Sequence, residues 1–234
     1  MTRFLASVKN VDEALIALDA GADIIDLKDP DKGALGALSA DEIREITARI
    51  GGRKPVSATI GDLPMQPDRI LFGVEHTAEL GVDIVKVGFF GVTGHRECAQ
   101  ALRALAVQGK KIVAVLFADQ FPDLTLIREL KRAGFYGVML DTSNKSGNAL
   151  SDYMTNHDLG EFISLAKSCD MECGLAGSLR ITDIPMLISL GPGYLGFRGA
   201  LCNASQRTQE IERERVEQAE KLLHGSNITC EYAV

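Results

Sequence analysis

Eight short apolar runs, separated by longer segments, recur along the whole chain and constrain its fold more than any other feature. The runs are residues 4–8, 24–27, 56–60, 84–87, 112–117, 137–140, 173–176 and 194–197. The segments between them carry apolar residues at helical spacing, as in residues 11–20, 40–50 and 124–133. Strands that alternate with helices in this way predict βαβ units and a parallel β-sheet.

The number and spacing of these units favour a closed barrel. The 234 residues give about 29 for each of eight units, close to a compact (β/α)8 barrel of about 250 residues. Several helical segments end in a glycine suited to the left-handed conformation, namely Gly21, Gly81, Gly134 and Gly191. We therefore expect an α/β fold, a single TIM-barrel catalytic domain over residues 1–234 with a short C-terminal tail from about residue 225. A doubly wound open sheet is the alternative, but residues 9–12 lack the glycine-rich first turn of that fold.

Composition excludes several classes of function. Hydrophobic residues make up 46% of the chain and charged residues 24%, so a sizeable core can form. A formal charge of −7 argues against a nucleic-acid-binding surface, although a local basic site for an anionic substrate is compatible with it. The cysteines form no C-x-x-C pair, and neither a signal pattern nor a membrane-spanning run is found, so we expect a cytoplasmic protein without a membrane partner. The four histidines lack ligand spacing, and no metal site is expected.

Two of the predicted strands carry charged residues on the face that should point into the barrel. In the second strand Asp26 and Lys28 alternate with apolar residues, and in the fourth strand Lys86 does the same. The sixth strand ends in Asp141, and Lys145 follows in a loop. Active sites of TIM barrels lie at the C-terminal ends of the strands, where these residues fall.

These charged residues allow a structural and a functional interpretation. A lone lysine at a strand end is usually solvated, and two buried lysines could form a purely structural layer of ion pairs with Asp26 and Asp141. Neighbouring cations and partial desolvation, however, favour a neutral lysine amine, which can attack a carbonyl carbon.

The last two strands indicate a phosphate site. Gly177 and Ser178 follow the seventh strand, ahead of a helical pattern from about Thr182, and Arg198 and Gly199 follow the eighth. Glycines let a phosphate approach backbone N–H groups, a helix N-terminus attracts an anion, and an arginine adds a charge-assisted contact. Either stretch alone is also an ordinary turn. Together, at the place where barrels often bind phosphate, they favour a phosphorylated substrate.

Six segments, in order along nearly the whole chain, resemble the (5-formylfuran-3-yl)methyl phosphate synthase family. They are residues 21–28 (GADIIDLK), 56–62 (VSATIGD), 84–88 (IVKVG), 139–142 (MLDT), 175–178 (LAGS) and 197–200 (FRGA). The resemblance implies a TIM barrel that condenses two molecules of glyceraldehyde 3-phosphate into a furan, with loss of phosphate and water, for methanofuran or a related C1 carrier. It implies no metal or organic cofactor.

The same resemblance implies roles for individual residues. Lys28 matches the Schiff-base lysine and Lys86 the proton-transferring lysine, while Asp26, Asp141 and Lys145 match further polar positions of the active site. Three alternatives stay open: another class I aldolase, a decarboxylase with the D-x-K-x-x-D spacing of the orotidine-phosphate decarboxylase superfamily, and a non-catalytic barrel subunit. That superfamily carries its motif on the third strand, whereas this chain carries residues 26–31 on the second. The expected partner is a small phosphorylated triose, and a homo-oligomer is left open.

Overall fold

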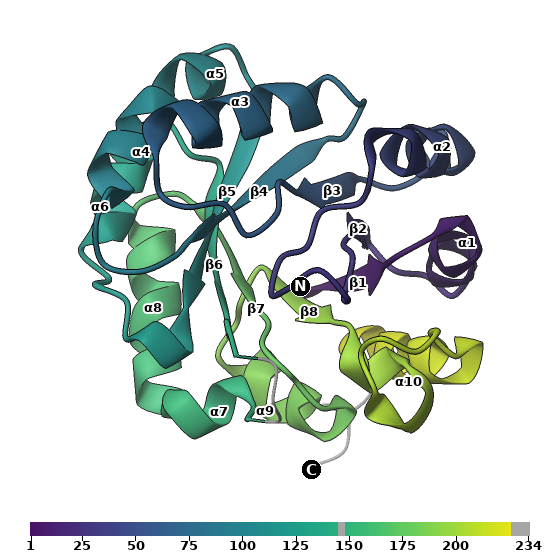
Figure 1. Cartoon of the computed structure of the whole chain (residues 1–234). Helices are drawn as coiled ribbons and strands as arrows, with labels where there is room; N and C mark the ends of the chain where they lie inside the picture. The colour runs from purple at the N-terminus through teal and green to yellow at the C-terminus, as the bar shows by residue number, and fades with distance from the viewer. Residues whose placement is uncertain (145–147, 226–234) are drawn as a thin grey trace.

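Eight parallel strands form a closed barrel in a computed structural model that describes residues 1–144 and 148–225 (Figure 1). The strands are β1 (Arg3–Val8), β2 (Ile24–Leu27), β3 (Val56–Thr59), β4 (Ile84–Phe89), β5 (Lys111–Phe117), β6 (Gly137–Asp141), β7 (Glu172–Leu175) and β8 (Tyr194–Phe197). Each strand pairs with its neighbours in chain order, and β8 pairs with β1. The predicted (β/α)8 TIM barrel is confirmed.

Helices surround the barrel on its outer face (Figure 1). They are α1 (Val11–Asp19), α2 (Ala40–Ile50), α3 (Pro67–Ala78), α4 (His95–Ala101), α5 (Arg103–Val107), α6 (Leu126–Arg132), α7 (Leu150–Tyr153), α8 (Asn156–Ser168), α9 (Ile184–Ser189) and α10 (Arg213–His224). Among the residues with described structure, none of these helices combines the length and the apolar character needed to cross a bilayer.

Local sequence signals account for several element boundaries. Ser39 and Glu42 form a capping box at the start of α2, and Gly51 ends that helix in the left-handed conformation. The four glycines expected to end helices all have positive φ, with values of 93°, 88°, 88° and 71° for Gly21, Gly81, Gly134 and Gly191.

The helix after β7 begins at Ile184, two residues later than the sequence suggests, and it is short. A 3₁₀ turn, η2 (Ile181–Asp183), precedes α9, which has only six residues. Pro185 lies in the first turn of α9, and Gly191 follows its end with positive φ. A helix this short offers little dipole for an anion, so any phosphate site here must depend on loop N–H groups and side chains.

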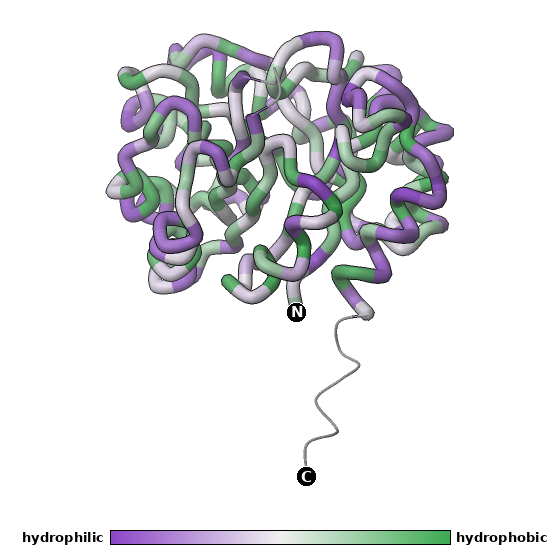
Figure 2. Tube along the Cα trace, turned by 90° about the horizontal axis from the view of Figure 1, so that it is seen from below, coloured by the Kyte–Doolittle hydropathy of each residue, from purple (hydrophilic) through white to green (hydrophobic). Residues whose placement is uncertain are grey.

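Apolar side chains form two layers that match the predicted strand faces. Ile25, Leu27 and Val85 belong to the layer between the strands and the helices, whereas Ile24 and Ile84 belong to a layer inside the barrel. Hydrophilic residues recur along the outer turns of the chain (Figure 2). The inner apolar layer fills the lower part of the barrel, and the polar residues that follow on the same faces therefore lie at its mouth.

The connection between β2 and α2 covers part of that mouth. Leu35 is 1% exposed and packs with the inner apolar layer. The Asp62 carboxylate accepts hydrogen bonds from the N–H groups of Ala34 (2.8 Å) and Leu35 (2.7 Å), which fixes this loop. Gly88 lies beneath it, since a Cβ there would come within 2.9 Å of Leu35 Cδ1. The loop shields the side of the mouth near β4.

Candidate active site

A cavity of about 830 Å³ opens at the C-terminal ends of the strands. Residues from β1, β2, β4, β6 and β8 line it, together with the loops that follow β7 and β8 and the first turns of α10. The predicted site residues that line the cavity are Asp26, Lys28, Lys86, Asp141, Gly177, Ser178, Arg198 and Gly199. Lys145 lies outside the described residues. The structure therefore brings eight of the nine predicted residues to one place.

Asp26 and Lys86 form the deeper of two ion pairs in this cavity. Lys86 Nζ lies 2.7 Å from Asp26 Oδ1, and both side chains are almost completely buried. The hydroxyl groups of Ser57 (2.6 Å) and Ser7 (2.8 Å) also donate to the Asp26 carboxylate. Three donors on one carboxylate offset much of the desolvation that burial of this charge costs.

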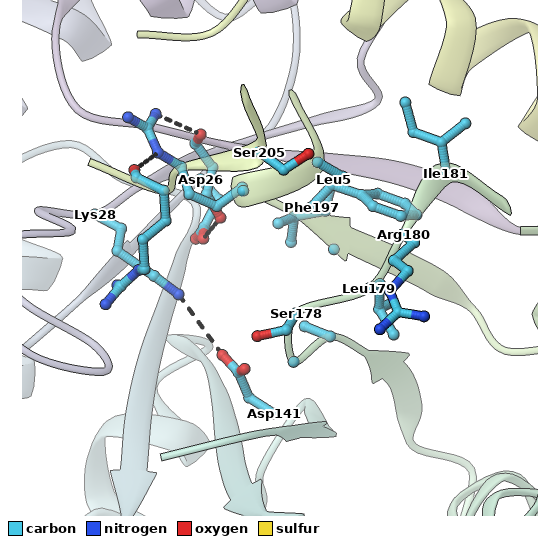
Figure 3. A pocket seen from close by; sticks show the side chains of 18 of the residues that line it. Leu5, Asp26, Lys28, Asp141, Ser178, Leu179, Arg180, Ile181, Phe197 and Ser205 are labelled. Atoms are coloured by element: carbon cyan, nitrogen blue, oxygen red, sulfur yellow. Dashed lines mark hydrogen bonds and ion pairs between the residues drawn. The ribbon is translucent and has the colours of Figure 1, made fainter. Parts of the chain in front are cut away.

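Lys28 and Asp141 form the second pair, nearer the mouth. Lys28 Nζ lies 3.6 Å from Asp141 Oδ2, and the two side chains point toward each other across the cavity (Figure 3). Lys28 directly follows β2, where its N–H donates to the carbonyl of Val8, and Asp141 is the last residue of β6. The expected pairing of the lysines with Asp26 and Asp141 is thus present, with Lys86 on Asp26 and Lys28 on Asp141.

Asp119 positions the loop that follows β6. Its carboxylate accepts hydrogen bonds from the Ser143 N–H (2.8 Å), the Ser143 hydroxyl (2.6 Å) and the Asn144 N–H (2.8 Å). Burial alone would raise the pKa of Asp119, but these hydrogen bonds hold it below its usual value. The residues after Asp141 are in this way tied to the end of β5.

The loop after β7 presents backbone donors to the cavity. Gly177 is buried and has a φ of 106°, and Ser178 has a φ of 50°. Their N–H groups find no hydrogen-bond acceptor among residues 1–144 and 148–225. An N–H without a partner is costly at the buried Gly177, whereas Ser178 is exposed, and the two donors together are suited to receive an anionic group of a ligand.

Arg198 lines the cavity, but its guanidinium is used within the protein. All five N–H groups are engaged: Nε donates to Arg207 O (2.8 Å), Nη1 to Ser7 O (3.2 Å) and to Glu13, and Nη2 to Glu13 Oε1 (3.1 Å) and to Gln209 O (2.8 Å). This revises the expectation of a direct contact between Arg198 and phosphate. No donor is left for one, and Arg198 acts instead as an internal anchor.

Sequence reasoning missed several residues that the fold brings to the cavity. Ser7 shares the inward face of β1 with Leu5, so strand alternation could have identified it. Arg180 and Arg207 come from loops without regular structure, and no local pattern marks them.

Within the described residues, His, Cys, Asp and Glu side chains form no group of three that could hold a metal ion. Cys202 is buried near the cavity, and burial raises the pKa of its thiol to about 11.

A closed barrel with two buried lysine–carboxylate pairs at its mouth defines a TIM-barrel enzyme with amine and carboxylate groups in its active site. The model of the 4-HFC-P synthase family matches residues 4–220, and the chain belongs to this family. The resemblance found in the sequence is thereby confirmed, and so is the expectation of an enzyme.

Relatives of the chain carry the name of the same synthase. A protein of Methylorubrum extorquens, named provisionally as a (5-formylfuran-3-yl)methyl phosphate synthase, is 43% identical over 95% of this chain and 92% of its own length. The (5-formylfuran-3-yl)methyl phosphate synthase of Methanosarcina mazei is 37% identical over 92% of this chain and 96% of its own length. The synthase of the same name from Methanopyrus kandleri is 35% identical over 92% of this chain and 95% of its own length.

Solved structures with the same fold are more distant in sequence. Phosphoribosyl anthranilate isomerase from Thermus thermophilus matches with a TM-score of 0.70 at 14% identity, covering 97% of this chain and all of that one. The 3-hexulose-6-phosphate synthase of Salmonella typhimurium matches with a TM-score of 0.65 at 20% identity, covering 95% of this chain and all of that one. At these identities the likeness supports the barrel fold alone.

Proposed function

We propose that this enzyme condenses two molecules of glyceraldehyde 3-phosphate into (5-formylfuran-3-yl)methyl phosphate, releasing one phosphate and two water molecules. The product would enter the biosynthesis of methanofuran or a related C1 carrier. The observation that carries the proposal is the presence of two buried lysine–carboxylate pairs in one cavity, in a member of a family whose relatives bear this synthase name.

Lys28 is the proposed nucleophile. Its amine adds to the aldehyde carbon of one triose phosphate, and loss of water gives an iminium, which withdraws electrons from the neighbouring C–H bond. Lys28 is at the end of β2 on the wall of the cavity, where a substrate carbonyl can reach it. Asp141 beside it can balance the positive charge of the iminium.

Lys86 is the proposed proton-transfer group. It lies inside β4, deeper than Lys28, and its contact with Asp26 fixes the position of the ammonium. As the neutral amine, Lys86 accepts the proton next to the iminium, which gives an enamine and leaves the Lys86 ammonium beside Asp26. The enamine carbon then attacks the aldehyde of the second triose phosphate. Asp26, Asp141 and Lys145 are proposed to assist the later proton transfers, in which ring closure and elimination expel water and phosphate.

The substrate phosphates need separate recognition. The N–H groups of Gly177 and Ser178, with Gly199 at the end of β8, are the proposed backbone donors for one phosphate. The proposed chemistry uses the iminium formed by a lysine as the electron sink and therefore requires no organic cofactor.

Product analysis with glyceraldehyde 3-phosphate tests the proposal. We expect a product with the ultraviolet absorbance and the mass of the furan phosphate, together with one equivalent of inorganic phosphate. An open-chain aldol adduct would identify a class I aldolase instead, and release of carbon dioxide from a sugar acid phosphate would identify a decarboxylase. No conversion by a folded protein would indicate a non-catalytic barrel.

A further inference from the structure

We propose that Arg207 binds a phosphate group of the substrate and makes the site select phosphorylated aldehydes over neutral ones. The identity of the substrate rests on the proposed function, whereas the anion site itself rests on the geometry described below. Arg207 belongs to the connection between β8 and α10, and it lines the same cavity as Lys28 and Asp141.

The backbone that carries Arg207 is held at three consecutive carbonyl groups. Arg198 donates to the carbonyls of Arg207 and Gln209, both at 2.8 Å, and Lys9 Nζ donates to the carbonyl of Thr208 at 2.8 Å. The Arg198 guanidinium is in turn paired with the buried Glu13 carboxylate. A loop without regular structure is thereby fixed to the ends of β1 and β8, so the Arg207 side chain extends from a defined position.

The Arg207 side chain reaches past the end of β1 to the loop that follows β2. Its Nη2 donates to the carbonyl of Gly33, in the connection between β2 and α2, at 3.1 Å. In the part of the chain that the structure describes, this is its one side-chain hydrogen bond, and no carboxylate lies within ion-pairing distance. The guanidinium stays protonated at neutral pH and is half-buried, so four N–H donors remain for a ligand.

The other arginines of the cavity are not equivalent to Arg207. The N–H groups of Arg198 all donate to groups of the protein itself, and Arg215 is paired with Glu212 at 2.7 Å. Arg180 is exposed at the rim (Figure 3). Arg207 thus combines partial desolvation with unused donors, which is the combination that strengthens an ion contact.

Phosphate is the ligand chemistry that best fits this group. A guanidinium offers paired N–H donors that match two oxygens of a phosphate, and it does so most strongly out of bulk water. The N–H groups of Gly177 and Ser178 supply a neutral site after β7, so Arg207 adds a charged one on the side of β1 and β2. Two sites of this kind match a reaction in which two phosphorylated molecules meet.

Binding of inorganic phosphate, measured by titration calorimetry, tests the anion site without any assumption about turnover. We expect Arg207→Gln to weaken binding roughly 10- to 100-fold and Arg207→Lys to retain part of it. Arg180→Gln is the matched control, because it removes an arginine from the rim of the same cavity, and its affinity should be unchanged. Equal affinity of the wild type and Arg207→Gln, or a loss confined to Arg180→Gln, would overturn the proposal.

Borohydride trapping with two aldehydes tests selectivity. Glyceraldehyde 3-phosphate and unphosphorylated glyceraldehyde differ at the phosphate, so Arg207→Gln should lower trapping of the first and leave trapping of the second unchanged. An equal fall for both aldehydes would indicate that Arg207 only closes the mouth and would contradict the proposal. If phosphate binding depends on Arg207 while no furan forms, the proposed function fails and the anion site stands. If furan forms and the Arg207→Gln variant keeps full selectivity for the phosphorylated aldehyde, the proposed function stands and the anion site at Arg207 fails.

Discussion

At the scale of single residues, the two lysines occupy different surroundings. Lys86 is 2% exposed and contacts the Asp26 carboxylate, which also accepts hydrogen bonds from two serine hydroxyls. Lys28 is 6% exposed and lies at the mouth of the barrel. A group at the mouth can meet two substrates in turn, and a group beneath it can move protons without leaving its ion pair. This difference in depth underlies the two roles proposed for them.

Lys28→Arg should abolish formation of the covalent adduct. Arginine keeps the positive charge beside Asp141, but its guanidinium stays protonated and forms no iminium. We expect turnover to fall below detection while the affinity for inorganic phosphate is kept. Peptide mapping after borohydride reduction with glyceraldehyde 3-phosphate checks this, with the exposed Lys110→Arg as control. A substrate mass on Lys86 or Lys145 in the wild type would contradict the assignment.

Lys86→Met should separate adduct formation from proton transfer. Methionine keeps much of the length of the side chain and removes the amine, so trapping at Lys28 should persist. Exchange of the substrate C–H with heavy water, followed by NMR, should slow by about 10²–10⁴-fold, the usual effect of losing a positioned acid–base group. Normal exchange in this variant would move the proton-transfer role to Lys145 or Asp141.

At the scale of elements, alternation and capping explain what the sequence predicted well. The strand faces followed from residues such as Ile25 and Leu27, whose side chains pack outward while Asp26 points inward. The contacts between loops were not predictable, because they join residues far apart in the chain. Arg207 meets Gly33 across 174 positions, and Arg198 meets Glu13 across 185. No local pattern reports such pairs, which is why Arg198 was expected on phosphate and Arg207 was missed.

The hydrogen bonds from the β6 loop to Asp119 should make that loop sensitive to acid. The pKa of Asp119 is lowered in the folded protein, so its contribution to stability is present above the ordinary aspartate pKa of about 4 and is lost as the pH falls below it. Asp119→Asn should therefore lower the Tm at pH 7, and its difference from the wild type should shrink below about pH 4. Thermal unfolding followed by circular dichroism measures this, and a difference that does not change with pH would contradict it.

The same substitution should reduce activity through position rather than chemistry. Asp119 holds Ser143 and Asn144, which lie two and three residues after the proposed active-site residue Asp141. We expect kcat to fall while borohydride trapping at Lys28 still occurs. This outcome would distinguish a loop contact from a group that reacts with the substrate.

At the scale of the whole molecule, the barrel closes where β1 meets β8, and a buried ion pair secures this junction. Glu13 is 1% exposed, and its carboxylate accepts hydrogen bonds from Arg198 and from the N–H groups of Lys9 (2.8 Å) and Ile211 (3.3 Å). The pair connects the first helix, the last strand and the loop that carries Arg207. α10 packs beside α1 and β1 over the same junction (Figure 1).

Breaking this pair should destabilise the protein as a whole. Arg198→Met leaves the Glu13 carboxylate buried without its guanidinium, which typically costs about 3–5 kcal/mol. The double variant with Glu13→Gln should lose less than the sum of the two single changes, because neither charge is then stranded. Urea unfolding of the three variants provides the measurement. Additive losses would show that the two residues act independently.

The distance along the chain between the two sides of this junction has a consequence for biosynthesis. Glu13 leaves the ribosome before its partner Arg198, which follows 185 residues later. A nascent chain that has emerged as far as β7 already contains both lysine–carboxylate pairs described above, yet β1 still lacks its second neighbour. The active site is therefore completed only after β8 has emerged, and a stalled fragment that ends before β8 holds the reactive side chains without the closed barrel that arranges them.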